Sequence, residues 1–303
     1  MYHYVRDYKK TSFPKIKGLD INDFKTQIKY LKKNYNILNP YEIHEIIEKK
    51  KNFSEKDCWI TFDDGYIDHY EYVLPELKKN GIKATFYPPV ISATHSDILD
   101  PTKIHYILSV ENNIKFILNY IKDSFLRLSK SNDEDSFYKI LNKIDTSDRF
   151  DKKETVYIKI LLQKALPLQI RNEILDDLFK KFISGDIPSF SKNIYMSTSQ
   201  IKELYDNGHE IGLHGYDHLW MGSLNSEEQK NEITTSLNFW KNLSVIKDKF
   251  TMCYPYGDYN EDTLKILSES DCICGLLSSI GPDPIANYQS LELPRYDTND
   301  FPK

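Results

Sequence analysis

Residues 58–66 read Cys-Trp-Ile-Thr-Phe-Asp-Asp-Gly-Tyr, so an apolar, β-branched run ends in two acids and a glycine. Such a run before a turn residue is typical of a buried strand, and we predict a strand over Cys58 to Phe62. Parallel α/β folds place reactive side chains where their strands end. Asp63 and Asp64 lie there, and their carboxylates repel each other unless a cation or a shared proton relieves the repulsion. Taken alone, the stretch also fits a turn in which an aspartate only caps a neighbouring element.

Runs of similar length recur along the chain and alternate with helical patterns. Residues 21–34 place apolar side chains at helical spacing, and Asp20 or Asn22 is available to cap the start of that helix. Alternation of strands with helices is typical of a parallel sheet. The expected strands are Tyr2 to Val5, Cys58 to Phe62, Ile82 to Tyr87, Glu210 to Leu213, Phe250 to Tyr254, Cys272 to Leu276 and Leu291 to Leu293.

The alternation breaks between about Pro101 and Ser184, where helical patterns occupy Ile104 to Leu128 and Ile170 to Ile183. We therefore expect a single domain over residues 1–303, with a helical insertion at residues 101–184. The insertion follows a predicted strand, so it should emerge on the face that carries the two aspartates, as a lid or a docking surface. An oligomerisation element on the outside of the domain is the alternative.

Two histidines four residues apart follow another short apolar run. Residues 208–218 read Gly-His-Glu-Ile-Gly-Leu-His-Gly-Tyr-Asp-His. A helix that began after Gly212 would put the imidazoles of His214 and His218 on one side, where both can bind one metal ion. Two unrelated surface histidines are the alternative. The third ligand has to come from elsewhere in the chain, and the Asp63-Asp64 pair offers an oxygen donor at a comparable strand end.

A third cluster, residues 253–257, reads Cys-Tyr-Pro-Tyr-Gly and also follows a predicted strand. Taken alone it is an ordinary loop built on proline and glycine. Beside the other two clusters, it would present a backbone N–H and tyrosine rings to a ligand. That combination suits an oxyanion site and a stacking wall.

Composition excludes several classes of function. A net charge of −5 and a pI near 5.9 give no attraction to phosphate backbones, so nucleic acid is not an expected partner. Neither a signal-peptide pattern nor an apolar stretch of membrane-spanning length is present, and we expect a cytoplasmic protein without an integral membrane segment. The four cysteines are too few and too irregularly spaced for a disulfide framework, so we expect reduced thiols.

Taken in order, Thr61 to Tyr66, His214 to His218 and Tyr254 to Gly257 resemble the motifs of the polysaccharide deacetylases, carbohydrate esterase family four. The resemblance extends from His3 to Arg295 and leaves the helical insertion outside it. It implies an α/β fold, namely a distorted (β/α) barrel with about seven strands.

The resemblance also implies a set of roles. Asp64, His214 and His218 would hold one divalent metal ion, with zinc expected and cobalt, nickel or iron as alternatives. Asp63 would be the base that takes a proton from the attacking water, and the backbone N–H of Tyr256 would help to bind the oxyanion. The side chains expected to line the substrate are Tyr66, Tyr254, Pro255 and Tyr256.

The chain departs from the family pattern at two positions. Cys253 stands where the third motif often begins with an arginine that orients the base. Residues 291–295, Leu-Glu-Leu-Pro-Arg, contain no histidine where the final motif often supplies the general acid. The proton donor to the leaving amine is therefore unassigned. Arg295 is the candidate that would orient Asp63 from the other side of the barrel.

The implied activity is a metal-dependent hydrolase that removes an N-acetyl group from an amino sugar or glycan. The lack of an export pattern favours a cytoplasmic precursor of a surface polysaccharide as the substrate. A deformylase or an O-deacetylase would use the same site. A barrel that binds glycan without turnover is the alternative from a different class, and Asp63 argues against it because binding needs only Asp64 and the two histidines.

Overall fold

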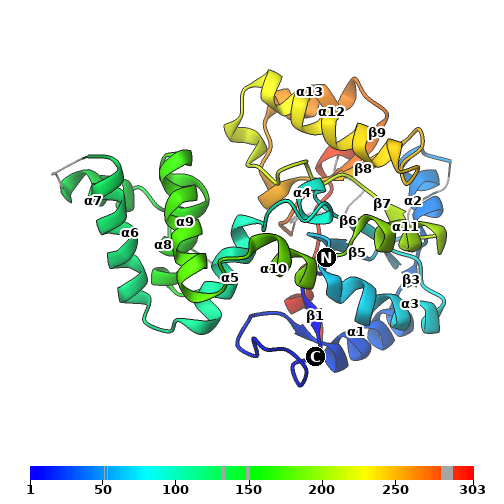
Figure 1. Cartoon of the computed structure of the whole chain (residues 1–303). Helices are drawn as coiled ribbons and strands as arrows, with labels where there is room; N and C mark the ends of the chain where they lie inside the picture. Colours follow the sequence, from blue (N-terminus) through cyan, green and yellow to red (C-terminus); the bar gives the residue numbers. More distant parts are fainter. Residues whose placement is uncertain (51, 53, 131–133, 148–150, 281–288) are drawn as a thin grey trace. The chain divides into compact units, whose positions relative to one another are not determined.

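In a computed structural model of the protein, all residues are described except 51, 53, 131–133, 148–150 and 281–288. The chain divides into two compact units (Figure 1). The first unit contains residues 1–8, 18–97 and 191–303, and the second contains residues 9–17 and 98–190. The second unit thus includes residues 9–17, which we had not expected to belong with the helical insertion.

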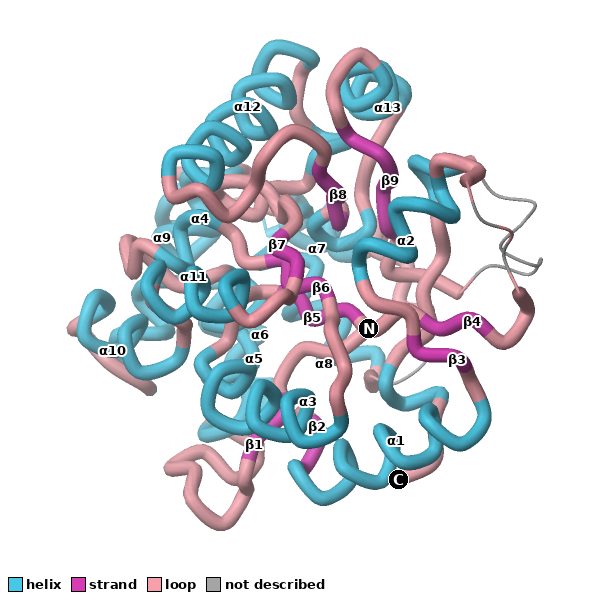
Figure 2. Tube along the Cα trace, turned by 90° about the vertical axis from the view of Figure 1, so that its right-hand side faces the viewer, coloured by secondary structure: helices cyan, strands magenta, loops and turns pink. Residues whose placement is uncertain are grey.

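The strands of the first unit pair in parallel, which confirms the expected α/β class. Strands β5 (Thr61–Asp63), β6 (Thr85–Tyr87) and β7 (Glu210–Ile211) form a three-stranded sheet (Figure 2). Three further pairs are β1 (Val5–Arg6) with β2 (Leu19–Asp20), β3 (Asn36–Ile37) with β4 (Asp57–Cys58), and β8 (Phe250–Cys253) with β9 (Cys272–Leu276).

Isolated parallel bridges extend these small sheets. They join Tyr2 to Phe62, Leu213 to Met252 and Leu276 to Leu293. The bridges connect most of the short sheets into one series of parallel strands. Among the described residues, the first and last strands of this series do not pair to close a barrel. Closure into a barrel of about seven strands therefore stays a prediction.

Most of the observed strands are shorter than the apolar runs that predicted them. The run at Ile82 to Tyr87 yields pairing only over Thr85–Tyr87, and the run at Leu291 to Leu293 contributes a single bridge at its last residue. Strand Cys272–Leu276 has the predicted bounds. Apolar runs mark buried chain, whereas strand bounds depend on where the neighbouring backbone runs parallel.

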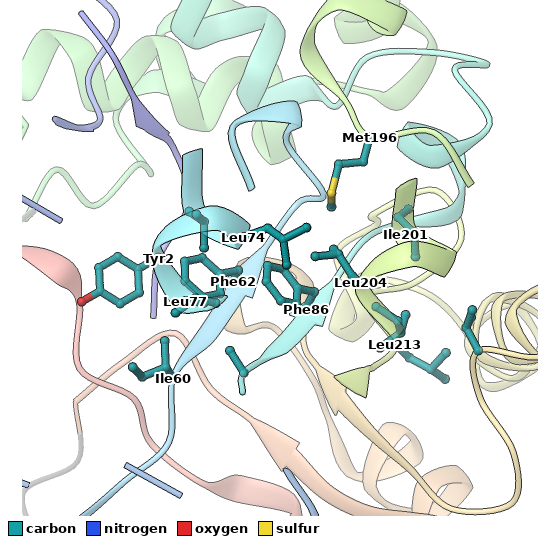
Figure 3. Packing of buried hydrophobic residues seen from close by; sticks show 14 of the residues in the cluster. Tyr2, Ile60, Phe62, Leu74, Leu77, Phe86, Met196, Ile201, Leu204 and Leu213 are labelled. Carbon is teal, nitrogen blue, oxygen red and sulfur yellow. The ribbon is translucent and has the colours of Figure 1, made fainter. Parts of the chain in front are cut away.

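The core of the first unit sets the register of the central sheet. The rings of Phe62 and Phe86, both fully buried, stack with centroids 4.9 Å apart (Figure 3). Leu74 and Leu77 lie around them. Side chains alternate along a strand. With Phe62 in this core, Asp63 is turned to the other face of the sheet at the carboxyl end of β5.

Helices surround these strands in the first unit. Helix α1 (Ile21–Asn34) has the predicted bounds, and the carboxylate of its N-cap Asp20 accepts a hydrogen bond from the backbone N–H of Asn22. The other helices are α2 (Pro40–Ile47), α3 (Leu74–Asn80), α4 (Val90–Ala93), α11 (Thr198–Asp206), α12 (Ser226–Asn242) and α13 (Glu261–Ser268). Short helical segments are η1 (His69–Val73), η3 (Met221–Ser223), η4 (Pro255–Gly257), η6 (Ser290–Glu292) and η7 (Thr298–Asp300).

The second unit is built from helices (Figure 1). They are α5 (Asp100–Val110), α6 (Ile114–Leu128), α7 (Glu134–Leu141), α8 (Lys153–Ile160), η2 (Leu161–Ala165) and α9 (Leu168–Phe182), while α10 (Ile187–Ile194) crosses its boundary. The helical stretch expected at Ile104 to Leu128 is in fact two helices. The first helix ends at Val110, and the side chain of Asn113 caps the start of α6. Among the described helices, none is long and apolar enough to cross a bilayer.

Candidate active site

The two adjacent acids point to different partners because the chain turns between them. Asp63 is the last residue of β5, and the next residues, Asp64 and Gly65, have φ of +70° and +71°. Aspartate is one of the few non-glycine residues that adopt this left-handed conformation readily. The backbone N–H of Asp64 donates to the carbonyl of Tyr87 on β6 (3.1 Å), which anchors the turn to the sheet.

The histidine segment is a loop and not the helix that we expected after Gly212. Leu213 bridges to Met252 on β8, and Gly215 and His218 then have φ of +76° and +57°. Left-handed residues break an α-helix. The turn nevertheless brings both imidazoles to one point, since the Nε2 atoms of His214 and His218 lie 3.4 and 3.5 Å from Oδ1 of Asp64.

Asp64, His214 and His218 form a buried cluster whose ligand atoms all lie within 4.8 Å of one another. The carbonyl oxygen of Cys253 accepts a hydrogen bond from Nδ1 of His214 (2.8 Å), so Nε2 faces the cluster. The hydroxyl of Tyr66 donates to Oδ2 of Asp64 (2.9 Å), so the other carboxylate oxygen, Oδ1, faces the cluster. Second partners that orient each ligand are typical of metal sites, and this donor set fits a divalent metal ion.

The charges within the cluster also fit a cation. Burial lowers the pKa of His214, but Cys253 and the hydrogen bond to Asp64 outweigh it and raise that pKa well above the ordinary value. Burial and the neighbouring His214 lower the pKa of His218 to about 3. Metal ligation requires an unprotonated imidazole nitrogen on each histidine, so metal binding at this set competes with protonation.

Asp63 is paired with Arg295 in a two-pronged ion pair. Nη1 and Nη2 of the arginine donate to Oδ1 (2.9 Å) and Oδ2 (2.7 Å) of the carboxylate. The arginine is fixed in turn, since Nη1 donates to Oγ1 of Thr61 (3.1 Å) and Nε to the carbonyl of Leu277 (2.7 Å). Burial would raise the pKa of Asp63, but the guanidinium holds it below the usual range. Asp63 is therefore an ionised carboxylate in a fixed orientation.

Cys253 lies against this ion pair. Its Sγ accepts a hydrogen bond from Nη2 of Arg295 (2.9 Å) and lies 3.5 Å from Oδ2 of Asp63. A second set of three donors, Asp63, His214 and Cys253, also lies within ligand distance. The Asp64 set is the better metal site, because both oxygens of Asp63 are already bonded to the guanidinium.

His3 completes the surroundings of Asp63. Its Nε2 lies 3.8 Å from Oδ2 of Asp63, and its side chain is 40% exposed, against 2% for the aspartate. The carbonyl oxygen of His3 accepts a hydrogen bond from Nε2 of the buried His69 (2.7 Å). His3 is thus held at the opening of the cluster, with a ring that solvent and ligands reach.

The expected substrate wall is only partly exposed. Tyr256, in η4, is half-buried with φ of +60°, and its ring lies 4.7 Å from that of His218. Tyr66 and Tyr254 are each 1% exposed and Pro255 is buried, so these three side chains have no face open to a sugar. The buried hydroxyl groups of the two tyrosines are satisfied by hydrogen bonds, since Tyr66 donates to Asp64 and Tyr254 donates to the carbonyl of Leu291.

One aromatic neighbour of the site was missed in the sequence. Trp220 stacks on Tyr256, with ring centroids 4.1 Å apart and planes inclined by 8°. Both rings are half-buried, so they form an aromatic surface beside His218. The signal was present, since the tryptophan follows His218 by two residues.

The sequence profile of a family described as polysaccharide deacetylase matches residues 50–97 and 174–272 of this chain. The matched ranges contain both aspartates, both histidines and Cys253. The chain belongs to the polysaccharide deacetylase family. Arg295 and His3 lie outside the matched ranges, so the profile of the deacetylase family does not cover these two neighbours of Asp63, which the structure brings to it.

Two curated proteins show the relationship in sequence. A putative polysaccharide deacetylase, YxkH of Bacillus subtilis, is 39% identical over 88 residues, which is 29% of either chain. A peptidoglycan-N-acetylglucosamine deacetylase of Bacillus cereus is 27% identical over 104 residues, covering 34% of this chain and 38% of that protein. The aligned stretches therefore span well under half of both relatives.

Solved structures show a similar fold over almost the whole chain. The deacetylase PplD of Streptococcus pyogenes, in complex with acetate, superimposes with a TM-score of 0.57 at 17% identity, covering 97% of this chain and 88% of that one. A de-N-acetylase from Aggregatibacter actinomycetemcomitans gives 0.54 at 16% identity, covering 98% and 93%. IcaB from Ammonifex degensii gives 0.54 at 15% identity, covering 97% and 88%. At these identities the likeness concerns the fold alone.

Proposed function

We propose that the protein is a metal-dependent hydrolase that removes an N-acetyl group from an amino sugar or glycan. The observation that carries this proposal is that two adjacent acids have different neighbours. Asp64 faces two histidines, whereas Asp63 faces Arg295 and the exposed His3. A site that only bound metal or sugar would need no second ionised carboxylate beside the ligands. Acids in contrasting environments are typical of general acid-base chemistry.

Asp64, His214 and His218 would hold one divalent metal ion, with zinc expected and cobalt, nickel or iron as alternatives. When bound, such an ion supplies a Lewis acid for the amide carbonyl and for the attacking water. Three ligands from the protein leave positions open for water and substrate, which distinguishes a catalytic from a structural zinc site.

Asp63 would take the proton of the attacking water. The ion pair with Arg295 keeps the carboxylate ionised and fixes the direction of its oxygens. The backbone N–H of Tyr256, beside His218, would bind the developing oxyanion, a contribution that typically amounts to about 10²–10³ in rate for one donor. Trp220 and Tyr256 would form the wall against which the sugar ring lies.

We assign the proton for the leaving amine to His3, which the sequence left without a role. It is the histidine beside Asp63 whose ring is exposed, and imidazole is the side chain that most often donates protons near neutral pH. Nε2 of His3 lies 3.8 Å from Oδ2 of Asp63, so one bridging water would carry a proton from the base to the acid. We further propose that the strands close into a (β/α) barrel and that the substrate is a cytoplasmic precursor of a surface polysaccharide.

Replacement of Asp63 by asparagine tests the proposal. Asp63→Asn keeps the shape of the side chain but removes its basic lone pair, so acetate release should fall by about 10²–10⁴ while metal content stays at the wild-type level. We would measure acetate and formate released from chitin oligomers, UDP-linked acetamido sugars and lipid-linked saccharides, with zinc, cobalt, nickel or iron added.

The matched control is His214→Ala, which should lose both metal and activity. Acetate release by Asp63→Asn at the wild-type rate would move the base to another residue. Formate in place of acetate would identify a deformylase. If the wild-type protein bound the saccharides but released neither acid, it would be a glycan-binding protein and not a hydrolase.

A further inference from the structure

The loop between the two histidines rests on a buried carboxylate. Glu232, on α12, is 5% exposed, and its Oε1 accepts hydrogen bonds from the backbone N–H groups of Tyr216 (2.8 Å) and Asp217 (2.7 Å). One helical turn further along α12, the hydroxyl of Ser236 donates to the carbonyl of Gly215 (3.1 Å).

These contacts hold a conformation that the loop would not keep by itself. Gly215 and His218, the two left-handed residues, flank the N–H groups of Tyr216 and Asp217. The left-handed region is sterically unfavourable for a residue with a side chain such as histidine. Successive N–H groups that point the same way concentrate positive potential, and when buried they need an acceptor. The carboxylate of Glu232 is that acceptor.

The fit between the glutamate and the loop is close. A Cβ atom on Gly215 would lie 2.9 Å from Oε1 of Glu232 and 3.5 Å from the backbone nitrogen of His218. Only a glycine leaves space for the carboxylate there, and the same residue supplies the positive φ. Glycine and glutamate therefore depend on each other, although they lie on separate elements of the first unit.

We propose that Glu232 is a positioning residue that sets the spacing of His214 and His218, with Ser236 as a second support. This inference rests on the proposed function in one respect, namely that the two histidines bind a metal. Partners behind a ligand typically change metal affinity by about 10–100-fold. We expect a loss of that size in Glu232→Ala, because the N–H groups of Tyr216 and Asp217 lose their acceptor and the loop relaxes.

Conservative variants separate positioning from simple structural support. Glu232→Gln keeps an amide oxygen at the same reach, so its zinc affinity should stay close to that of the wild type. Glu232→Asp keeps the charge but withdraws the oxygens by one methylene, so it should lose affinity. Gln229→Ala is the matched control, because Gln229 is buried on the same helix but bonds to Leu224, Asn260 and Thr263 and not to the loop.

Zinc affinity would be measured by competition with a chromophoric chelator, and ligand geometry by the visible spectrum of the cobalt-loaded protein. Unfolding of the metal-free variants gives the stability loss for comparison. We expect weaker zinc binding and an altered cobalt spectrum in Glu232→Ala and Glu232→Asp, with neither change in Gln229→Ala.

Wild-type affinity and spectrum in Glu232→Asp would overturn the inference, and this variant decides the question if Glu232→Ala does not fold. A loss in Gln229→Ala as large as that in Glu232→Asp would show that α12 acts only through stability. Failure of the proposed function gives a different result. A wild-type protein that binds no divalent metal refutes both, whereas one that binds metal but deacetylates nothing refutes only the function.

Discussion

Single side chains decide what each of the two neighbouring aspartates can do. The guanidinium that fixes Asp63 comes from Arg295, 232 residues further along the chain, while Cys253 occupies the position from which the family often supplies an arginine. The sulfur of Cys253 accepts a hydrogen bond from the same guanidinium. A charge brought from the far end of the chain thus takes the place of one missing from the third motif.

The assignment of His3 leads to a prediction about leaving groups. An amine has to be protonated as it leaves, whereas 4-nitrophenolate leaves without a proton. His3→Gln should therefore lower turnover of an acetamido sugar by about 10²–10⁴ but change 4-nitrophenyl acetate hydrolysis little. Steady-state kinetics on the two substrates, with zinc content measured in parallel, provide the comparison.

Asp63→Asn is the control for that experiment, because the base is needed whatever group leaves, so both reactions should slow. Equal losses on the amide and the ester in His3→Gln would show that His3 positions Asp63 and is not the proton donor.

At the scale of the elements, a glycine allows a side-chain hydrogen bond to connect β6 with β8 across β7. Gly212 continues β7, where its N–H donates to the carbonyl of Phe86 (2.9 Å). The ring of Tyr87 crosses over this glycine, and its hydroxyl donates to Oγ1 of Thr251 on β8 (2.9 Å). The sheet that carries Asp63 is thereby joined to the strand that leads to Cys253.

Gly212→Ala should weaken this junction. The added Cβ would lie 2.2 Å from Cε1 of Tyr87 and 2.8 Å from Oγ1 of Thr251, and both atoms are buried. Overpacking of this kind typically costs about 1–3 kcal/mol of the free energy of unfolding. Urea unfolding followed by circular dichroism would measure the loss.

The matched control is Gly185→Ala, whose nearest neighbour is a lysine side chain at 3.7 Å and whose φ is not in the left-handed region. It should change the free energy of unfolding little. An equal loss in both variants would mean that the crossing of Tyr87 over β7 does not constrain the sheet.

At the scale of the whole molecule, burial of histidines makes stability depend on pH. His209 is 3% exposed, and its Nδ1 accepts a hydrogen bond from the backbone N–H of Ala84 (3.2 Å). Burial, with nearby Lys83 and Lys78, lowers its pKa from 6.5 to about 4. Between those values the unfolded chain binds more protons than the folded one. Stability from this group is therefore complete above pH 6.5 and falls as the pH drops toward 4.

His209→Gln removes that dependence, since glutamine does not titrate. The destabilisation it causes should be largest near neutral pH and shrink in acid, because the wild type loses up to about 1.4 kcal/mol per pH unit from this imidazole. Urea unfolding of both proteins across this range, with a chelator present to remove metal, would give the difference. A difference that stays constant with pH would contradict the assigned cause.

The sequence by itself determined the features that local pattern encodes. The spacing of Phe24, Ile28 and Leu31 with Asp20 as cap gave helix α1 its bounds, because capping and amphipathic spacing act within a few residues. The apolar run before Asp63 indicated a buried strand end for the same reason. Three short motifs in order were enough to indicate the family.

Only the tertiary structure decided which residues meet. The family resemblance offered Arg295 as a candidate partner of Asp63, and only the structure shows the two side chains paired. Nothing in the sequence indicates that Glu232 accepts hydrogen bonds from the loop of His218. The four-residue spacing of the histidines predicted a helix, but the loop has left-handed residues instead. Residue spacing carries no information on a left-handed conformation that distant contacts stabilise. Partners far apart along the chain are selected by the packing of the whole unit, and that selection leaves no local pattern to find.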